Sequence, residues 1–500
     1  MSDIVIDKFN DVHAIVKCNE SIAHELNDHF KFRVPNFQFH PLFRNKQWDG
    51  YLHIFKKQNR LIYSGLTQRV IDFALARDYE ITYNTDLLPD AHIDKETVEK
   101  WINTWLKPHK EGKRIEPWDN QITGIWKAIN HTRAIFISPT GSGKSLFIYG
   151  IVRYLDCIIE PGQKILIVVP TTSLVEQMYN DFEDYAGPNS KWKVEDECHR
   201  IYTGKEKQTD KTVVITTWQS IYRKRKEFFD QFSAVVGDEC HHYKAKSLIG
   251  IMEKLHNCPY RIGCTGTLDG IPTNKLVIQG LFGPIHRLAK TQELIEDNKL
   301  AKLKIDCILL QYPESERKET HKLKYIEELK WITQHNKRNQ FIRDLSLTIS
   351  GNTLVLFQYV EKHGEPLHEL IKKSGKKTGR KVFFVSGKVH AKEREEIRKI
   401  VNKEKNAIIV ASYGTFSTGI NIENLSNIIF ASPSKSRIRV LQSIGRQLRK
   451  SETKSKARLF DIADDLQIKR YKNYTLKHYI ERIKLYNEER FPYNIRKVNL

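Results

Sequence analysis

One short segment of the sequence could bind the phosphates of a nucleotide. Residues 138–145 read Ser-Pro-Thr-Gly-Ser-Gly-Lys-Ser and follow the apolar run Ala134–Ile137. Glycine lets the backbone turn its N–H groups toward phosphate oxygens, a lysine adds a positive charge, and a hydroxyl at the start of the next helix can ligate Mg²⁺. The strict pattern has glycine where this chain has serine at its first position, and an ordinary strand–turn–helix is the structural alternative. The candidate residues are Ser138, Thr140, Gly141, Ser142, Gly143, Lys144 and Ser145.

A pair of carboxylates follows a second apolar run. Val-Val-Gly leads directly into Asp238 and Glu239, about 95 residues after the glycine-rich segment. An aspartate at the end of a strand can hold Mg²⁺ through water, and a glutamate beside it can orient or deprotonate the water that attacks a phosphate. The Cys-His-His run that comes next makes zinc the alternative, but adjacent residues rarely chelate one ion. We therefore interpret Asp238 and Glu239 as catalytic, and Asp238 with Ser145 as the magnesium site.

Regular elements must bring these two segments together. Short apolar runs separated by helical stretches predict parallel strands that are covered on both faces. The runs are Ala134–Ile137, Ile165–Val169, Val213–Thr216, Ala234–Val236, Thr353–Phe357, Val382–Val385, Ala407–Val410, Ile428–Ala431 and Arg458–Ile462. They fall in two blocks joined by a charged, helix-prone stretch, which predicts the α/β class with two parallel-sheet lobes. A small α+β domain should precede the lobes and a short helical extension should follow them.

Length and charge limit the function. A chain of 500 residues predicts three or four domains, and we place them at 1–95, 96–286, 287–465 and 466–500. Lys and Arg exceed Asp and Glu by 82 − 60 = 22. Residues 287–500 carry 45 − 25 = 20 of this excess, which favours a nucleic-acid partner over a merely solvated basic surface.

Several features indicate an intracellular location. The sequence has no run of 18 apolar residues that would predict a membrane span and no signal-peptide pattern at its start. Its seven cysteines are scattered and include no Cys-x-x-Cys, which disfavours both a disulfide framework and a zinc ribbon.

The N-terminal region combines basic and aromatic residues. Between His29 and Val70 lie eight Lys or Arg and nine aromatic residues, against the single acid Asp49. Basic groups bind phosphates, and aromatic rings can stack on bases or wedge a junction. The alternation of Phe30 with Phe32 and of Phe37 with Phe39 suits strand faces turned into a core. We therefore expect most of the phenylalanines in the core and the cations at the surface. The candidate DNA contacts are Lys56, Lys57 and Arg60.

Two C-terminal features have structural rather than catalytic interpretations. Asp461, Asp464 and Asp465 resemble a nuclease cluster, but their position after the last strand favours a helix N-cap and surface charge. Tyr479, Tyr486 and Tyr493 recur every seven residues, a spacing that would keep them near one helical face, but Pro492 should end the helix before the third of them. We expect this tail to pack on the second lobe rather than stack on bases.

Together these segments resemble the motifs of superfamily 2 helicases, in the order of that family. The similar segments are Trp118–Gln121, Pro170–Gln177, Thr216–Gln219, Asp238–His241, Gly263–Thr267, Thr353–Gln358, Ser412–Ile422 and Gln442–Arg449. The resemblance covers about residues 115–465, and the N-terminal segment extends it to the branch-processing DNA helicases of phages and the XPB-like group. The chain departs from the common pattern with Gly263 in place of alanine and Asn421 in place of aspartate.

The resemblance assigns further roles. It implies two RecA-like lobes, adenine recognition by Gln121, and nucleic-acid contacts from Pro170, Thr171, Thr217 and Thr415. Gln442, Arg446 and Arg449 become catalytic candidates, since Gln442 would position water or sense the γ-phosphate. Arg446 and Arg449 are three residues apart, which would place both on one helical face, where they could stabilise the charge of the transition state.

The function that the resemblance implies is an ATP-dependent DNA helicase or translocase that uses ATP and Mg²⁺. Its substrates would be forked DNA, four-way junctions and RNA–DNA loops in phage recombination, repair and replication. It would act as a monomer in the host cytoplasm, with partners among replication and recombination proteins. The alternatives are an RNA helicase, a DNA translocase subunit that does not separate strands, and a binding protein with an inactive ATP fold.

Overall fold

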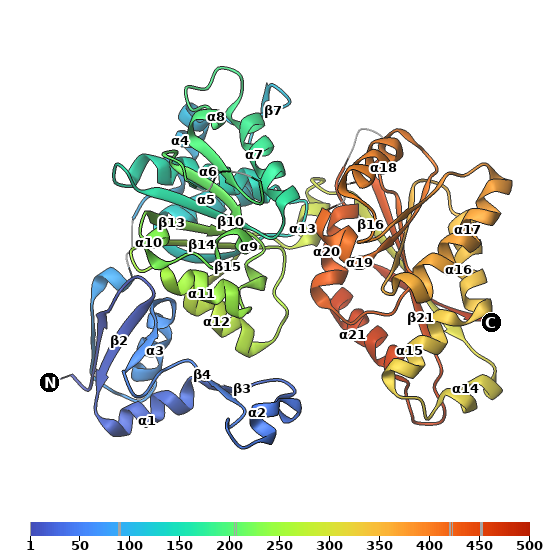
Figure 1. The fold of residues 1–500 in the computed structure, drawn as a ribbon, viewed down its shortest axis with the longest axis horizontal. Helices are drawn as coiled ribbons and strands as arrows, with labels where there is room; N and C mark the ends of the chain where they lie inside the picture. The colour runs from blue at the N-terminus through green and yellow to red at the C-terminus, as the bar shows by residue number, and fades with distance from the viewer. Residues whose placement is uncertain are drawn as a thin grey trace. The chain divides into compact units, whose positions relative to one another are not determined.

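The chain folds into two compact units. The computed structural model describes residues 2–88, 92–204, 206, 208–419, 422, 424–450 and 454–500. The first unit comprises residues 1–138 and 143–288, and the second comprises 139–142 and 289–500 (Figure 1). Each unit contains one seven-stranded sheet, and the first also contains a four-stranded sheet. In the described ranges, no helix is long and apolar enough to cross a membrane.

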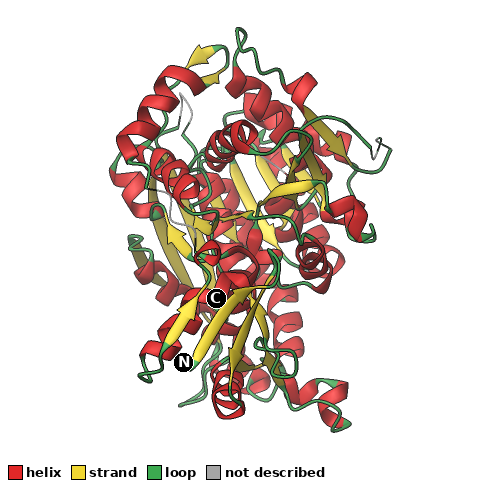
Figure 2. Cartoon of the chain, turned by 90° about the vertical axis from the view of Figure 1, so that its left-hand side faces the viewer, coloured by secondary structure: helices red, strands yellow, loops and turns green. Residues whose placement is uncertain are grey.

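The N-terminal part of the first unit is a small α+β layer, as expected. Its sheet has the order β5-β2-β1-β6 and faces the viewer in Figure 2. The elements are β1 (Ile4–Lys8), β2 (His13–Cys18), α1 (Glu20–His29), β5 (Leu61–Tyr63), α3 (Thr67–Leu75) and β6 (Ile81–Tyr83). Alternate residues of β1 and β2 are buried with Leu26 of α1 and Val70 of α3. This period-two burial is what a strand with one covered face requires.

A hairpin inserted between α1 and β5 differs from the expectation. It consists of β3 (Lys31–Arg33), a 3₁₀ helix (Phe37–Phe39), α2 (Pro41–Arg44) and β4 (Tyr51–His53). Phe30 is buried as predicted, but the placement of Phe37 and Phe39 on inward strand faces was wrong. Phe39 is 64% exposed, and Phe37 is half-buried between the Phe43 ring, edge-on at 4.6 Å, and the Arg33 guanidinium at 4.4 Å. The prolines that flank this segment have no N–H group to continue a strand ladder.

The seven strands of the first unit's large sheet are all parallel, in the order β11-β12-β10-β13-β14-β9-β15. They are β9 (Arg133–Ile137), β10 (Lys164–Val169), β11 (Cys198–Ile201), β12 (Val213–Thr217), β13 (Phe232–Gly237), β14 (Tyr260–Thr265) and β15 (Ile285–Arg287). The helices are α4 (Lys95–Trp101), α5 (Asp119–Asn130), α6 (Lys144–Ile158), α7 (Thr172–Ala186), α8 (Val194–Glu197), α9 (Trp218–Ile221), α10 (Lys226–Phe229), α11 (Lys246–Lys254) and α12 (Pro272–Phe282), with a π-helix at Ile102–Leu106 and a small hairpin of β7 (His109–Lys110) and β8 (Lys113–Arg114). Because the strands are parallel, the loops that follow them meet at one edge.

The second unit repeats this architecture with the order β18-β19-β17-β20-β21-β16-β22, again all parallel. The strands are β16 (Lys302–Gln311), β17 (Thr353–Phe357), β18 (Val382–Val385), β19 (Ile408–Ser412), β20 (Asn427–Phe430), β21 (Lys456–Asp465) and β22 (Tyr493–Asn499). The helices are α13 (Thr291–Glu296), α14 (Glu314–Thr320), α15 (Tyr325–Gln334), α16 (Asn336–Thr348), α17 (Glu365–Thr378), α18 (Ala391–Lys403), α19 (Tyr413–Gly419), α20 (Arg437–Gln447) and α21 (Tyr474–Glu488), with a π-helix at Val360–Gly364. The two sheets confirm the predicted α/β class with two lobes.

The strands that the sequence analysis missed are informative. All the predicted apolar runs form strands, but β11, β14, β15, β16 and β22 were not among them. The stretch expected to be a helix-prone connection contains β16, which pairs with β21 over its whole length. Its first half alternates lysine with apolar residues, so its continuous apolar run is confined to residues 307–310. The tail beyond residue 465 was expected to be helical, but it also supplies β22 to the sheet.

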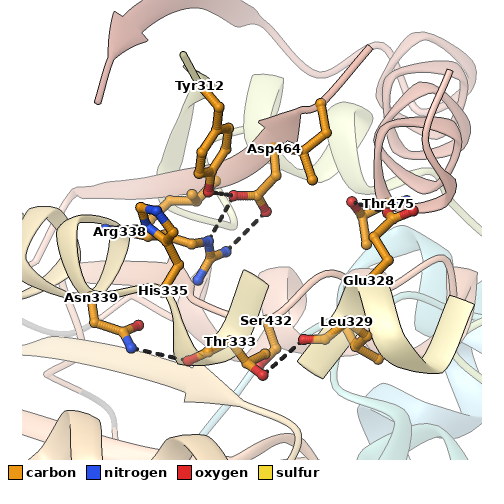
Figure 3. A network of polar contacts seen from close by, with 12 residues as sticks. Tyr312, Glu328, Leu329, Thr333, His335, Arg338, Asn339, Ser432, Asp464 and Thr475 are labelled. Atoms are coloured by element: carbon orange, nitrogen blue, oxygen red, sulfur yellow. Dashed lines mark hydrogen bonds and ion pairs between the residues drawn. The ribbon is translucent and has the colours of Figure 1, made fainter. Parts of the chain in front are cut away.

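The acidic residues of β21 were predicted to lie on the surface, and this was wrong. Asp461 and Asp464 are fully buried within the sheet. Arg482 of α21 donates to Asp461 at 2.7 Å, and Arg338 of α16 donates to Asp464 at 2.7 Å (Figure 3). A buried carboxylate requires such a partner, because an unpaired charge in the interior is costly. Tyr479 and Tyr486 of α21 are buried as well, which confirms that the tail packs on the second lobe.

Candidate nucleotide site and nucleic-acid interface

The glycine-rich loop lies where the sequence placed it, between β9 and α6. Gly141 and Gly143 adopt φ values of +91° and +77°, which side-chain-bearing residues rarely adopt. A Cβ atom on Gly143 would also lie 2.0 Å from the side-chain nitrogen of Gln121. The loop ends at the N-terminus of α6, a helix of 15 residues. The free N–H groups of its first turn and the helix dipole make this end suited to an anion such as a nucleotide phosphate.

Gln121, the predicted adenine-reading residue, lies in the first turn of α5. Its side-chain oxygen accepts a hydrogen bond from the Trp118 N–H at 2.8 Å, and its side-chain nitrogen donates to the Gly143 carbonyl at 3.4 Å. The residue therefore caps its own helix and touches the backbone of the loop. This geometry places Gln121 beside the phosphate loop, and adenine recognition stays a prediction.

Lys144, Asp238 and Glu239 form a buried charged cluster at the strand ends. Lys144 Nζ donates to Glu239 Oε1 at 3.0 Å and lies 3.9 Å from Asp238 Oδ1. Burial alone would lower the pKa of Lys144, but the charges of Glu239 and Asp238 outweigh it and raise that pKa. Burial raises the pKa of Asp238, while Lys144 opposes this. The lysine thus remains a cation beside the loop that would hold phosphates.

Glu239 is held from two further sides. His241 Nδ1 lies 3.2 Å from Glu239 Oε2 and 2.9 Å from Thr265 Oγ1, and Thr265 itself lies at the end of β14. Burial favours the neutral acid, but Lys144 and His241 outweigh it and hold the pKa of Glu239 well below its ordinary value. The backbone of Glu239 has φ +48°, a strained conformation that persists where surrounding contacts impose it. The glutamate is therefore ionised and fixed in orientation.

The oxygen atoms in this cluster suit magnesium. Mg²⁺ prefers carboxylate, hydroxyl and phosphate oxygens and retains several waters. Asp238 supplies a carboxylate, and the Ser145 hydroxyl lies at the start of α6, 2.8 Å from the Tyr185 hydroxyl. Among the residues that the structure describes, no group of three His, Cys, Asp or Glu side chains could hold a metal ion. A magnesium ion here would therefore need nucleotide oxygens in addition to Ser145 and Asp238.

A pocket of about 540 Å³ opens at the carboxyl ends of β10, β11 and β12. It brings together the three residues of the first lobe that were predicted to contact nucleic acid, which are Pro170, Thr171 and Thr217. Its lining also includes Thr172 and Gln219, from the same helicase-like segments, and four residues that were not predicted, namely Tyr202, Thr203, Gly204 and Ser220. The Tyr-Thr-Gly segment carries no sequence signal of its own, because the strand before it, β11, is short and has no continuous apolar run.

The candidates of the second unit lie on or near α19 and α20. The Thr415 hydroxyl is buried and lies 2.7 Å from the Ser412 hydroxyl. Gln442 and Arg446 are half-buried residues of α20, but that helix ends at Gln447, so Arg449 lies beyond it. The expectation that both arginines lie on one helical face was wrong, because only Arg446 belongs to the helix. The Leu448 carbonyl, at the end of the helix, accepts a hydrogen bond from the Ala301 N–H at 2.8 Å. Asn421 lies outside the described residues.

The N-terminal cations lie in and beside the turn between β4 and β5. Lys56 is exposed, whereas Arg60 pairs with Glu20 at 2.5 Å and Lys57 lies 3.8 Å from the same carboxylate. Glu20 lies outside residues 29–70, the range in which the sequence shows a surplus of cations. Of the three predicted contacts, Lys56 therefore carries the least compensated charge.

Known proteins share this combination of sheets and loops. Three families match, described as DNA helicase UvsW, N-terminal (residues 3–84), Type III restriction enzyme, res subunit (93–270) and Helicase conserved C-terminal domain (336–451). The ATP-dependent DNA helicase uvsW of Enterobacteria phage T4 is 34% identical over 515 residues and 100% of both chains. The DNA 3'-5' translocase XPB2 of Sulfurisphaera tokodaii is 25% identical over 68% of this chain and 80% of its own.

Solved structures also resemble this chain. The crystal structure of T4 UvsW matches at TM-score 0.53 and 34% identity over 99% of both chains. The ATP-dependent Type ISP restriction-modification enzyme LlaBIII bound to DNA shares the fold at TM-score 0.57 over 85% of this chain, which spans 34% of that protein, at 16% identity. Two parallel-sheet lobes, a glycine-rich loop after β9 and an Asp-Glu pair after β13, together with these matches, identify a helicase of superfamily 2. Within that class, the chain belongs to the UvsW family of DNA helicases.

Proposed function

We propose that this protein uses ATP hydrolysis to move along DNA and to remodel branched DNA, including forks, four-way junctions and RNA–DNA loops. The observation that carries the proposal is similarity over the full length to a DNA helicase, including the N-terminal layer that matches the UvsW N-terminal family. Its setting would be phage recombination, repair and replication in the host cytoplasm. It would act as a monomer, with protein partners from those processes.

The buried cluster supports the hydrolytic step. ATP supplies the phosphoryl group, and Mg²⁺ neutralises charge on its oxygens. Lys144 would exchange its contact with Glu239 for a phosphate oxygen, and the ionised Glu239 would then accept a proton from the attacking water. His241 and Thr265 hold Glu239 in place during that exchange.

Other residues complete the proposed site. Ser138, Thr140, Gly141, Ser142 and Gly143 would surround the phosphates, and Ser145 with Asp238 would hold Mg²⁺. Gln442, Arg446 and Arg449 would act on the γ-phosphate from the second lobe, with the arginines stabilising transition-state charge. Since Arg449 follows the helix rather than lying on it, its reach depends on the loop and not on helical spacing.

The nucleic-acid path would begin at the pocket beyond β10, β11 and β12. Its hydroxyls and backbone groups suit a phosphate backbone rather than base edges. Thr415 would add a contact from the second lobe, and Lys56 with Lys57 and Arg60 would bind phosphates of the branch.

One experiment tests the proposal. ATP hydrolysis should be measured with single-stranded, duplex, forked and four-way DNA and with RNA, beside strand separation of the same substrates. We expect the largest stimulation and remodelling with branched DNA. Stimulation by RNA alone would indicate an RNA helicase, and stimulation by duplex DNA without strand separation would indicate a translocase. A Glu239→Gln variant serves as the matched control, because contaminating ATPases would survive that change.

A further inference from the structure

A cluster of tyrosines on the second unit is outside every helicase-like segment. It consists of Tyr325 at the start of α15, Tyr359 after β17, and Tyr471 and Tyr474 after β21, and we call it the tyrosine platform. The Tyr325 ring lies 5.9 Å from the Tyr474 ring, and α15 lies beside α21 in Figure 1. The π-helix that follows Tyr359 packs against α15. Tyr359 is 37% and Tyr471 41% exposed, so their rings are accessible to a ligand.

Positive charge surrounds these rings. Lys477 Nζ lies 5.6 Å from the ring centre of Tyr471 and 5.4 Å from that of Tyr474. Five cations of this region are exposed: Lys477, the chain neighbours of Tyr471, which are Lys469, Arg470 and Lys472, and Lys435, which follows β20. Within the described part of the chain, none of these five forms an ion pair with a carboxylate. In contrast, Lys484 on the same helix pairs with Glu481 at 2.8 Å.

A buried carboxylate fixes the platform in place. Glu328 of α15 accepts hydrogen bonds from the Tyr474 N–H at 3.0 Å and the Thr475 N–H at 2.8 Å, at the N-terminus of α21 (Figure 3). The Asn473 side chain also donates to Glu328 at 3.0 Å. The helices that carry Tyr325 and Tyr474 are therefore joined before any ligand arrives. A surface ordered in advance loses less conformational entropy on binding.

The position of the platform in the sheet also indicates a binding surface. Tyr359 follows β17, Lys435 follows β20, and Tyr471 follows β21, which are neighbouring parallel strands. Ligands of open α/β sheets bind beyond the carboxyl ends of the strands.

We propose that the tyrosine platform binds a single strand of DNA, whose bases stack on Tyr471 and Tyr474 and whose phosphates contact Lys477 and its neighbouring cations. Rings combined with cations are the features of single-strand binding surfaces, because every base offers a stacking face and every linkage a charge. A duplex would present its phosphates but keep its bases stacked away from the rings. The choice of DNA rests on the proposed function, in which remodelling releases single strands.

The test is a binding measurement on the full chain without nucleotide. Fluorescence anisotropy would follow a dye-labelled oligothymidylate and an abasic strand of equal length. Replacing Tyr471→Ala and Tyr474→Ala together should weaken oligothymidylate binding about 10- to 100-fold and leave abasic binding unchanged. The pair Tyr471→Phe and Tyr474→Phe keeps both rings and should bind like the parent. Tyr83→Ala, an exposed tyrosine of the first unit that is 44% exposed, is the control.

A second variant tests the charge. Lys477→Ala should reduce the slope of log affinity against log salt by about 0.7, whereas Lys484→Ala should leave it unchanged. The proposal is overturned if the alanine pair binds oligothymidylate normally, if abasic binding falls equally, or if an acidic peptide competes as well as the strand. Because no nucleotide is present, an absence of ATP hydrolysis would overturn the proposed function alone and leave this result interpretable.

Discussion

Buried cations meet carboxylates in both units, but in two different ways. In the first unit, Lys144 makes one hydrogen bond to Glu239 and lies 3.9 Å from Asp238. In the second unit, Arg338 contacts both oxygens of Asp464, at 2.7 and 3.1 Å, and Tyr312 donates to the same carboxylate. The lysine has a flexible stem and a single hydrogen bond to its carboxylates, so we expect that it can move to another anion. The arginine fork is held by two hydrogen bonds to one carboxylate and joins α16 to β21.

The second unit repeats the rigid arrangement at its tail. Arg482 of α21 contacts both oxygens of Asp461, and Tyr486 donates to one of them at 2.9 Å. The two arginine–aspartate pairs attach the helices α16 and α21 to the strand β21. Both helices lie outside the strand-and-helix repeat that the sequence predicts. The comparison teaches that burial and charge pairing do not identify a catalytic site. The number of contacts per cation, and whether the cation can exchange partners, separate the two cases.

The largest effect should come from the exchangeable pair. Lys144→Ala should lower the turnover number for ATP by about 10²- to 10³-fold, because a preorganised cation for transition-state charge is lost. The free energy of unfolding should change far less than this. Steady-state ATPase rates beside urea unfolding measure both quantities.

A Glu239→Gln variant sharpens this prediction. The amide cannot accept a proton from water, so ATP should bind but be hydrolysed very slowly. Near-normal turnover in either variant would show that this cluster is structural, like the arginine pairs.

Breaking the Arg338–Asp464 pair should lower the free energy of unfolding rather than act first on ATP turnover. Asp464→Ala leaves Arg338 buried without its carboxylate, and such a loss costs about 3–5 kcal/mol of unfolding free energy. The matched control is the double change Arg338→Met with Asp464→Leu, which removes both charges and should recover most of the loss. Urea unfolding followed by circular dichroism measures the difference. An equal loss in the single and double variants would contradict this account.

A buried neutral histidine gives a smaller, pH-dependent effect. Burial, and secondarily Arg338, lowers the pKa of His363 to about 3, from an ordinary value near 6.5. The unfolded chain therefore binds the proton first, so the stability from His363 is full above pH 6.5 and falls as the pH drops toward 3. Between pH 6.5 and 5 this residue should account for about 2 kcal/mol.

The His363 prediction can be checked in two ways. His363→Gln should show a shallower fall in unfolding free energy over that range than the parent. NMR titration of the parent should show no protonation of His363 above pH 5. A titration midpoint near 6.5 would mean that the ring is solvated.

The smallest effect should come from the exposed cations of the first unit. Replacing Lys56→Ala with Lys57→Ala should weaken binding to forked DNA and lower the log–log salt slope by at most about 1.8, or 0.9 per lost duplex contact. Because Lys57 is near Glu20, we expect most of the change from Lys56. The melting temperature should not change, since neither side chain is in the core. Unaltered binding would mean that residues of the second unit determine the selectivity for branched DNA.

Local sequence patterns determined the lobes and the chemistry of the first site. Continuous apolar runs predict buried parallel strands because their burial is uniform along the chain, and the phosphate loop follows its strand directly. Asp238 and Glu239 could be named for the same reason, since they follow such a run directly, and Lys144 could be named because it follows the glycine-rich loop. The full-length pattern of motifs also led to the helicase family.

Only the tertiary structure decided the rest. It showed that Glu20 neutralises Arg60, and that Asp464 is paired with Arg338, 126 residues away. It also ended α20 before Arg449, placed β16 and β22 in the second sheet, and brought tyrosines from the connection and the tail together. These features depend on contacts between distant segments. A composition window or a helical repeat reports only near neighbours, whereas the partner that satisfies a buried charge or an open strand edge is chosen by the fold.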